Sequence, residues 1–179
     1  MNKLLILFFM LVPTVAFSQK VVPQIIEQTG GMNGDAMKFN LSGKMLKMAF
    51  ESDENHANKD KQLQAFLTNV NKMSILLNFD LNSDKRVKIK KILYPYHELM
   101  SVVENGIKIG MYTLEEKGEI VEFVMCVEQN NSLTVMNMTG KIDLVQLSKL
   151  SKGVGVNRTN YLKNLDLLKK KNINHKNSR

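Results

Sequence analysis

The sequence predicts an α+β domain, built from an antiparallel meander sheet of five to six strands with helices packed on one face. Two observations carry this prediction. Residues 98–139 alternate apolar and polar side chains in short runs that are joined by turn residues, a pattern typical of an antiparallel meander. The segments on either side of these runs carry apolar residues at helical spacing instead.

The chain begins with a segment that has the features of a secretory signal peptide. Its start is positively charged, residues 4–17 are apolar, and the small residues Ala16 and Ser18 suit cleavage before Gln19. The apolar run is shorter than the roughly 20 residues that span a membrane. We therefore expect residues 1–18 to be removed and the protein to be exported to the periplasm or cell envelope, or secreted.

The remainder divides into a domain and a basic extension. Residues 19–152 are long enough for a single α+β domain with its own core. The formal net charge of the whole chain is +8, and residues 149–179 alone carry nine Lys or Arg residues and one acidic residue. We expect residues 153–179 to be a basic C-terminal extension that is helical over 159–171 and disordered beyond.

The first half of the domain is expected to alternate helices with strands. Pro23 suits the first turn of a helix, and Ser42 is a typical N-cap ahead of apolar residues at helical spacing. Polar residues 51–60 form a loop. The expected elements are a helix within 21–31, a strand at 37–41, a helix at 42–50, a helix at 61–70 and a strand at 72–80.

Residues 82–94 are expected to form a helix that Pro95 ends. Ser83 or Asp84 is the expected N-cap. We expect the apolar side of this helix to consist of Val87, Ile92 and Leu93, and its solvated side of Lys85, Arg86, Lys88, Lys90 and Lys91.

The meander itself is marked by its turns. Asn105-Gly106 is the strongest hairpin signal, because both positions tolerate the positive φ of a type I′ turn. Residues 116–118 and 129–131 mark the next two turns. The expected strands lie at 99–103, 107–112, 121–127 and 133–139, followed by a helix that Asp143 caps and whose Leu144, Leu147 and Leu150 face inward.

No segment supplies a complete catalytic, cofactor-binding or metal-binding motif, and we assign no residue to these roles. Residues 80–84 match the opening of an EF-hand loop, but Lys85 and Lys91 stand where that loop needs Gly and Glu. We interpret them as a strand end that leads into a helix cap. Gly153-Val154-Gly155 is half of a dinucleotide-binding motif, yet it follows a helix and not a strand.

Two side chains that could take part in a reaction remain to be considered. Cys126 is the only cysteine, so no intrachain disulfide forms, and its apolar surroundings indicate a small core residue. We interpret His97 as an exposed or partly satisfied side chain, with an enzymatic site near Glu98 and Tyr94 as the alternative. The glutamates of one hairpin are expected to be solvated charges, since a hairpin tip is wet: Glu115, Glu116, Glu119 and Glu122.

The chain is rich in methionine outside its first 18 residues. Such side chains fill irregular gaps, and they also re-pack around varied partners. An ordinary core is one interpretation, and a Met-lined cavity between sheet and helices is the other. The residues concerned are Met32, Met37, Met45, Met48, Met73, Met100, Met111, Met125, Met136 and Met138.

The basic extension is interpreted as a solvated end, with contact to an anionic membrane surface as the alternative. Nucleic acid is not expected as a partner, because an exported protein rarely meets it and no aromatic residues interleave the charges. The residues assigned to the anionic-surface contact are Lys163, Lys169, Lys170, Lys171, Lys176 and Arg179.

Three passages resemble the family called domain of unknown function 4252, a family of small exported proteins from Gram-negative bacteria. The passages are residues 98–106, the run Leu133 to Leu144 with its Thr-Gly-Lys-Ile-Asp-Leu segment, and Ser42-Gly43-Lys44-Met45-Leu46. The resemblance covers residues 37–152 and excludes the basic tail. It implies export and an α+β domain, and it implies no reaction and no functional residues.

The function expected from these observations is that of an exported, non-catalytic binding or interaction domain whose partner is an unknown envelope protein. The alternative is a carrier of lipid or another apolar ligand in the Met-lined cavity. A third hypothesis is an uncharacterised hydrolase with a site around His97. No cofactor is expected.

Overall fold

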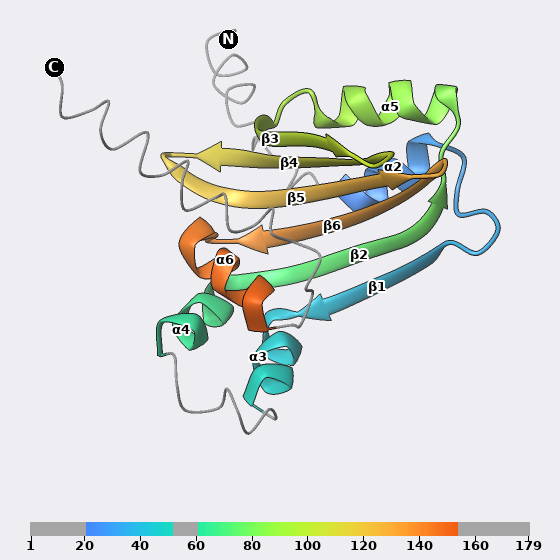
Figure 1. Ribbon diagram of the computed structural model, residues 1–179. Coiled ribbons are helices and arrows are strands. Elements are labelled where there is room, and N and C mark those ends of the chain that lie inside the picture. Colours follow the sequence, from blue (N-terminus) through green and yellow to red (C-terminus); the bar gives the residue numbers. More distant parts are fainter. Residues whose placement is uncertain (1–20, 52–60, 154–179) are drawn as a thin grey trace, which may run out of the picture.

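The computed structural model describes residues 21–51 and 61–153, and Figure 1 shows a twisted sheet with helices at both sides. Its strands are β1 (Met37–Ser42), β2 (Val70–Asp80), β3 (His97–Glu104), β4 (Ile107–Glu116), β5 (Glu119–Gln129) and β6 (Ser132–Gly140). Its helices are α2 (Val21–Gln28), α3 (Gly43–Glu51), α4 (Lys61–Asn69), α5 (Ser83–Leu93) and α6 (Leu144–Gly153).

The six strands form one antiparallel sheet in the order β1-β2-β6-β5-β4-β3. The four strands from β3 to β6 are the predicted meander, and each pairs with the next along the chain. The α+β class and the antiparallel sheet are therefore confirmed. β6 lies between β2 and β5, so the last strand of the described residues joins the meander to the antiparallel pair β1–β2, whose two strands are connected through α3 and α4 (Figure 1).

The three hairpins of the meander each turn through two residues with positive φ. Asn105 and Gly106 have φ values of 50° and 76°, as the Asn-Gly pair predicts. Residues 117–118 and 130–131 also have positive φ. Tight turns of fixed length set the register of the strands that they join. The register matters because a slip of one residue would move every side chain to the other face.

One face of the sheet is covered by α2 and α5. Val21 and Ile25 of α2, together with Ile89 and Ile92 of α5, are buried against apolar side chains of the central strands. The strand residues in this cluster are Leu76, Phe79, Val124, Cys126, Leu133 and Val135. We call this side the α5 face.

The opposite face, which we call the methionine face, has its own apolar cluster. Successive side chains of a strand point to opposite faces, so Phe123 and Met125 of β5 point away from α5. Phe66 and Leu67 of α4 and Leu147 of α6 are buried in this cluster. The strand methionines in contact with it are Met73, Met100, Met111, Met125, Met136 and Met138.

The helices are thus divided between the two faces, whereas the sequence pattern indicated cover on one. The physical reason is visible in β5, which is apolar on both sides: Val124 and Cys126 face α5, and Phe123 and Met125 face the other way. A central strand that is apolar on both sides needs cover on both.

Two glycines enclose the junction between α4 and β2. A Cβ atom on Gly43, at the start of α3, would overlap with the backbone oxygen of Val70. A Cβ atom on Gly140, at the end of β6, would overlap with the backbone oxygen of Asn69. The N–H of Lys141 donates to that same oxygen at 3.0 Å. The chain therefore approaches this junction from two sides with no room for a side chain.

The strands extend beyond their predicted ends, most of all β4, which was predicted to end at residue 112 and ends at Glu116. The boundary between α4 and β2 also differs. The helix predicted at 61–70 ends at Asn69, and β2 follows at once from Val70. The backbone contacts of Asn69 and Val70 with the two glycines leave no space for an intervening loop. The predicted signal segment, most of the loop at 51–60 and the predicted helix at 159–171 lie outside the described residues.

Candidate functional site

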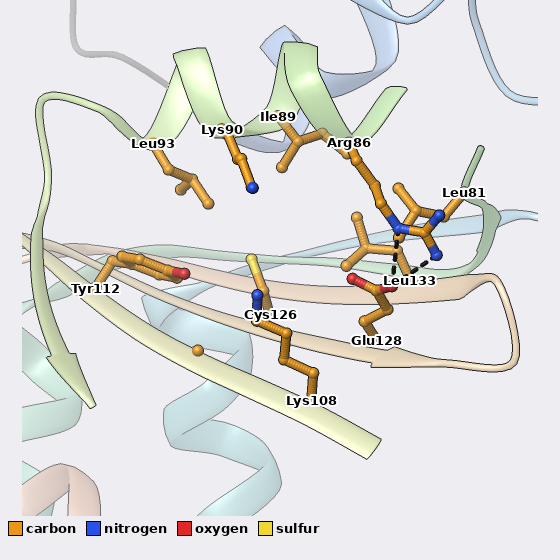
Figure 2. A pocket seen from close by; sticks show the side chains of 11 residues that line it. Leu81, Arg86, Ile89, Lys90, Leu93, Lys108, Tyr112, Cys126, Glu128 and Leu133 are labelled. Carbon is orange, nitrogen blue, oxygen red and sulfur yellow. Dashed lines mark hydrogen bonds and ion pairs between the residues drawn. The ribbon is translucent and has the colours of Figure 1, made fainter. Parts of the chain in front are cut away.

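A cavity of about 240 Å³ lies between α5 and the strands β4, β5 and β6 (Figure 2). Its walls are mostly apolar, and charged side chains stand at its open side. The residues that line it are Leu81, Arg86, Ile89, Lys90, Leu93, Lys108, Gly110, Tyr112, Cys126, Glu128 and Leu133.

The floor of this pocket is hollow because two small residues lie side by side on neighbouring strands. Gly110 of β4 and Cys126 of β5 are paired in register, and both lie under α5. The ring of Tyr112 lies against Gly110: a Cβ atom there would come within 2.6–2.9 Å of the Tyr112 phenol. The missing side chain at Gly110 therefore sets both the depth of the pocket and the position of the tyrosine.

The roof of the pocket is α5, whose first turn is held in place by Asn82 and Lys85. The Asn82 side chain accepts a hydrogen bond from the Lys85 N–H at 2.9 Å, so Asn82 is the N-cap and not Ser83 or Asp84. The Lys85 ammonium donates to the Asp80 carbonyl at 3.0 Å and lies 4.6 Å from the centre of the Phe79 ring.

Two expectations about α5 are corrected here. Lys85 is buried, with 6% exposure, and not solvated, because its ammonium finds a carbonyl and an aromatic face within the fold. Val87 is 53% exposed and does not belong to the apolar side. Ile89 takes that role, because the helix turns Ile89, Ile92 and Leu93 toward the sheet. The strand-to-cap interpretation of residues 80–84 is confirmed.

One end of the pocket is closed by an ion pair between the helix and the sheet. Arg86 of α5 donates to Glu128 of β5, with nitrogen–oxygen distances of 2.6 and 2.9 Å. It also donates to the Asn131 side chain at 3.0 Å. Both Arg86 and Glu128 are half-buried, so this pair fixes α5 over the β5–β6 turn (Figure 2).

The two weakly acidic groups of the pocket are held in their protonated forms. Burial raises the pKa of the Cys126 thiol to about 12. Burial, followed by the nearby Cys126 and Glu98, raises the pKa of Tyr112 to about 12. Since the thiolate is the nucleophilic form of cysteine, neither side chain offers an anionic nucleophile at neutral pH. The core position predicted for Cys126 is confirmed.

The structure does not bring His97 together with its neighbouring acid. His97 is exposed at the start of β3 and pairs with Thr113, whereas Glu98 pairs with Tyr112. Successive strand residues point to opposite faces, so the imidazole and the Glu98 carboxylate diverge. His97 does not line the pocket.

The pocket also differs from the expected Met-lined cavity. Its lining contains no methionine, and the strand methionines lie on the methionine face. The sequence contains one local signal for this site. Gly110 interrupts an alternating strand, and a glycine inside a strand often marks a place of close approach.

A second buried polar group lies near α2. Glu122 is 3% exposed; its carboxylate accepts hydrogen bonds from the Tyr96 hydroxyl at 2.9 Å and the Asn137 amide at 2.7 Å. Burial raises the pKa of Glu122, and these two hydrogen bonds and one from the Val21 N–H lower it in part. The expected solvated state holds for Glu115, Glu116 and Glu119 and is wrong for Glu122, whose side chain lies under α2 beside Val21.

The remaining predicted features fall outside these two sites. The tail residues assigned to an anionic surface, Lys163 to Arg179, lie outside the described residues, and their role stays a prediction. Among residues 21–51 and 61–153, no three His, Cys, Asp or Glu side chains are placed to hold a metal ion. Within that same part of the chain, no helix is long and apolar enough to cross a membrane.

The comparisons with known proteins give one match. A family model described as a domain of unknown function (DUF4252) matches residues 32–150. No curated protein and no solved structure matches the chain.

Proposed function

Because the chain belongs to the DUF4252 family, whose function is unknown, we propose a function from the site itself. The protein is an exported, non-catalytic domain that binds a small apolar ligand between α5 and the sheet. The observation that carries this proposal is the cavity of about 240 Å³ with its apolar walls. Export rests on the signal-like residues 1–18.

The walls of the pocket support binding and not a reaction. Leu81, Ile89, Leu93 and Leu133 offer apolar surface from both the helix and the strands, and burial of a ligand methylene is worth about 0.8 kcal/mol. Cys126 remains a neutral thiol in this environment. Ligand sites of this kind combine apolar walls with a few polar groups at fixed places.

We expect octan-1-ol to bind in this pocket and to shift the amide signals of α5, β4 and β5 in a ¹H–¹⁵N NMR titration of the purified protein. Replacing Cys126→Met should weaken binding by about tenfold or more, because the longer side chain fills part of the cavity. The matched control is Val127→Met, which adds bulk at the next residue of β5 but on the methionine face.

The two variants together make the test specific. Val127→Met should keep the affinity of the unchanged protein, and both variants should keep the dispersed spectrum of a folded domain. Equal loss of affinity in both variants, or no saturable shifts in the unchanged protein, would contradict the proposal.

A second candidate function is the docking of another exported polypeptide along β1. This strand is an edge of the sheet, and Met37 and Phe39 on one of its sides are 46% and 45% exposed. Edge strands with unpaired backbone groups are templates for strand addition. A partner with an extended apolar segment would therefore fit this edge.

A photo-crosslinking side chain at Phe39 tests the second candidate in intact cells. We expect it to yield a discrete adduct of one partner, while the same side chain at Val103 does not. Val103 is the matched control because it lies on the opposite edge strand, β3, and is 72% exposed. The same adducts from both positions would show that the contact is not specific to β1.

A further inference from the structure

We infer that the ligand of the α5 pocket is a straight-chain amphiphile with one carboxylate head group, bound by Lys90 and Lys108 at the open side. The inference rests on the proposed function, and it adds the chemical class of the ligand. It follows from the charges of the lining, from their existing partners and from the size of the cavity.

Charge separates the two ends of the pocket. Three cationic side chains and one carboxylate line it, which leaves a formal charge of +2 beside an apolar interior. The carboxylate is Glu128, and Arg86 already pairs with it at 2.6 Å. The excess positive charge therefore belongs to Lys90 and Lys108.

These two lysines come from opposite walls. Lys90 extends from α5 toward the sheet, and Figure 2 shows its ammonium group above Cys126. The Lys108 side chain extends from β4, and its ammonium group overlaps Cys126 in this view. Both side chains are exposed at the pocket's open side. Neither makes an ion pair or hydrogen bond within the described ranges 21–51 and 61–153. An anionic group between them would be held from both sides.

The surroundings favour a compact anionic head group. Lys108 stands opposite Glu128 in the strand register, so a head group near Lys108 is also near the Glu128 carboxylate. Arg86 already pairs with that carboxylate, so the net field on the head group is the positive one of the two lysines. The carboxylate of a fatty acid is the simplest head group that combines one charge with an unbranched apolar chain.

The cavity sets the length of this chain. One water molecule takes up roughly 30 Å³ in the liquid, and a methylene group is of similar size. A volume of about 240 Å³ therefore holds roughly eight such groups. Leu81, Leu133 and Ile89 supply the apolar contacts along this length. Octanoate is therefore the appropriate probe, and octan-1-ol is its uncharged counterpart of equal length.

We expect octanoate to bind about fivefold to tenfold more tightly than octan-1-ol at neutral pH and low salt, the gain that two exposed ion pairs supply. The Lys90→Gln, Lys108→Gln double variant should reduce octanoate affinity to the level of octan-1-ol. The advantage of octanoate should also shrink as salt is added, because exposed ion pairs are screened.

Lys91→Gln is the matched control, since it removes a charge from the same helix at a position that does not line the pocket. It should change neither affinity. If octan-1-ol binds but octanoate binds no more tightly, or if the double variant keeps the difference, the inference is overturned and the proposed function stands. If neither compound binds, the proposed function and the inference both fall.

Discussion

Replacing Gly140 with alanine is expected to destabilise the domain by about 3 kcal/mol or more. Two costs add at this position. Gly140 has a φ of 131°, which side-chain-bearing residues rarely adopt and which costs on the order of 1–3 kcal/mol. Its new Cβ would also overlap with the backbone of Asn69, and overpacking in a rigid region costs roughly 1–3 kcal/mol.

Two further glycines separate these costs. Gly118 has a φ of 81° with open space around it, so Gly118→Ala should show the conformational cost alone. Gly43 has no positive φ, but its Cβ would overlap with the Val70 oxygen, so Gly43→Ala should show the steric cost alone. The measurement is urea unfolding of all three variants. If Gly140→Ala were no worse than Gly118→Ala, the close approach at residues 69–70 would not be rigid.

Removing the buried carboxylate at Glu122 is expected to have the second large effect. Glu122→Leu should lower the free energy of unfolding by about 2–3 kcal/mol, because the Tyr96 hydroxyl and the Asn137 amide both lose the Glu122 carboxylate as an acceptor. Asn137 keeps a longer hydrogen bond of 3.4 Å to the Phe123 carbonyl. Glu122→Gln should be far milder. Its amide oxygen can accept from Asn137, while its NH₂ group can donate to the Tyr96 oxygen.

The two variants also differ from the unchanged protein in their response to pH. Burial raises the pKa of Glu122 in the folded state above its ordinary value near 4.5. Below pH 4.5 the carboxyl is protonated in both states and carries no penalty. As pH rises above 4.5, the unfolded state ionises first, so the unchanged protein loses folding stability until the pH passes the folded-state pKa.

Glutamine does not titrate, so Glu122→Gln should escape this loss. The free energy of unfolding of Glu122→Gln minus that of the unchanged protein should therefore rise with pH above 4.5. Thermal or urea unfolding at a series of pH values measures this difference. A difference that fell with pH would mean that the hydrogen bonds outweigh burial and that the pKa of Glu122 is lowered.

The fold could be predicted wherever the local pattern and the tertiary environment agree. The Asn105-Gly106 turn and the alternation around it needed no distant contacts, and both appear as predicted. The boundary between α4 and β2 was displaced because Gly43 and Gly140, far away in sequence, close on Val70. Local sequence propensity does not predict a close contact between residues that are far apart in the sequence.

The site was harder to predict, because it depends on which face a residue shares with its neighbours across the sheet. Gly110 and Cys126 form a floor only through the β4–β5 register. The sequence pattern predicts that Lys85 is on the surface. In the fold its ammonium group is buried, because it contacts the Asp80 carbonyl and the Phe79 ring. The sequence shows that Glu122 lies in the same hairpin as three exposed glutamates. It does not show that α2 covers the Glu122 side chain, and the solvated state predicted for it is therefore wrong.

The place of β6 within the sheet has a consequence for how the chain reaches its native state. The ribosome synthesises β6 after the other five strands of the described sheet, yet β6 lies between β2 and β5. The β1–β2 pair and the β3–β5 strands therefore cannot join until nearly all of the domain has emerged. Until β6 is in place, the inner edges of β2 and β5 lack their partner, and such unpaired strand edges are the parts of a folding chain most exposed to aggregation.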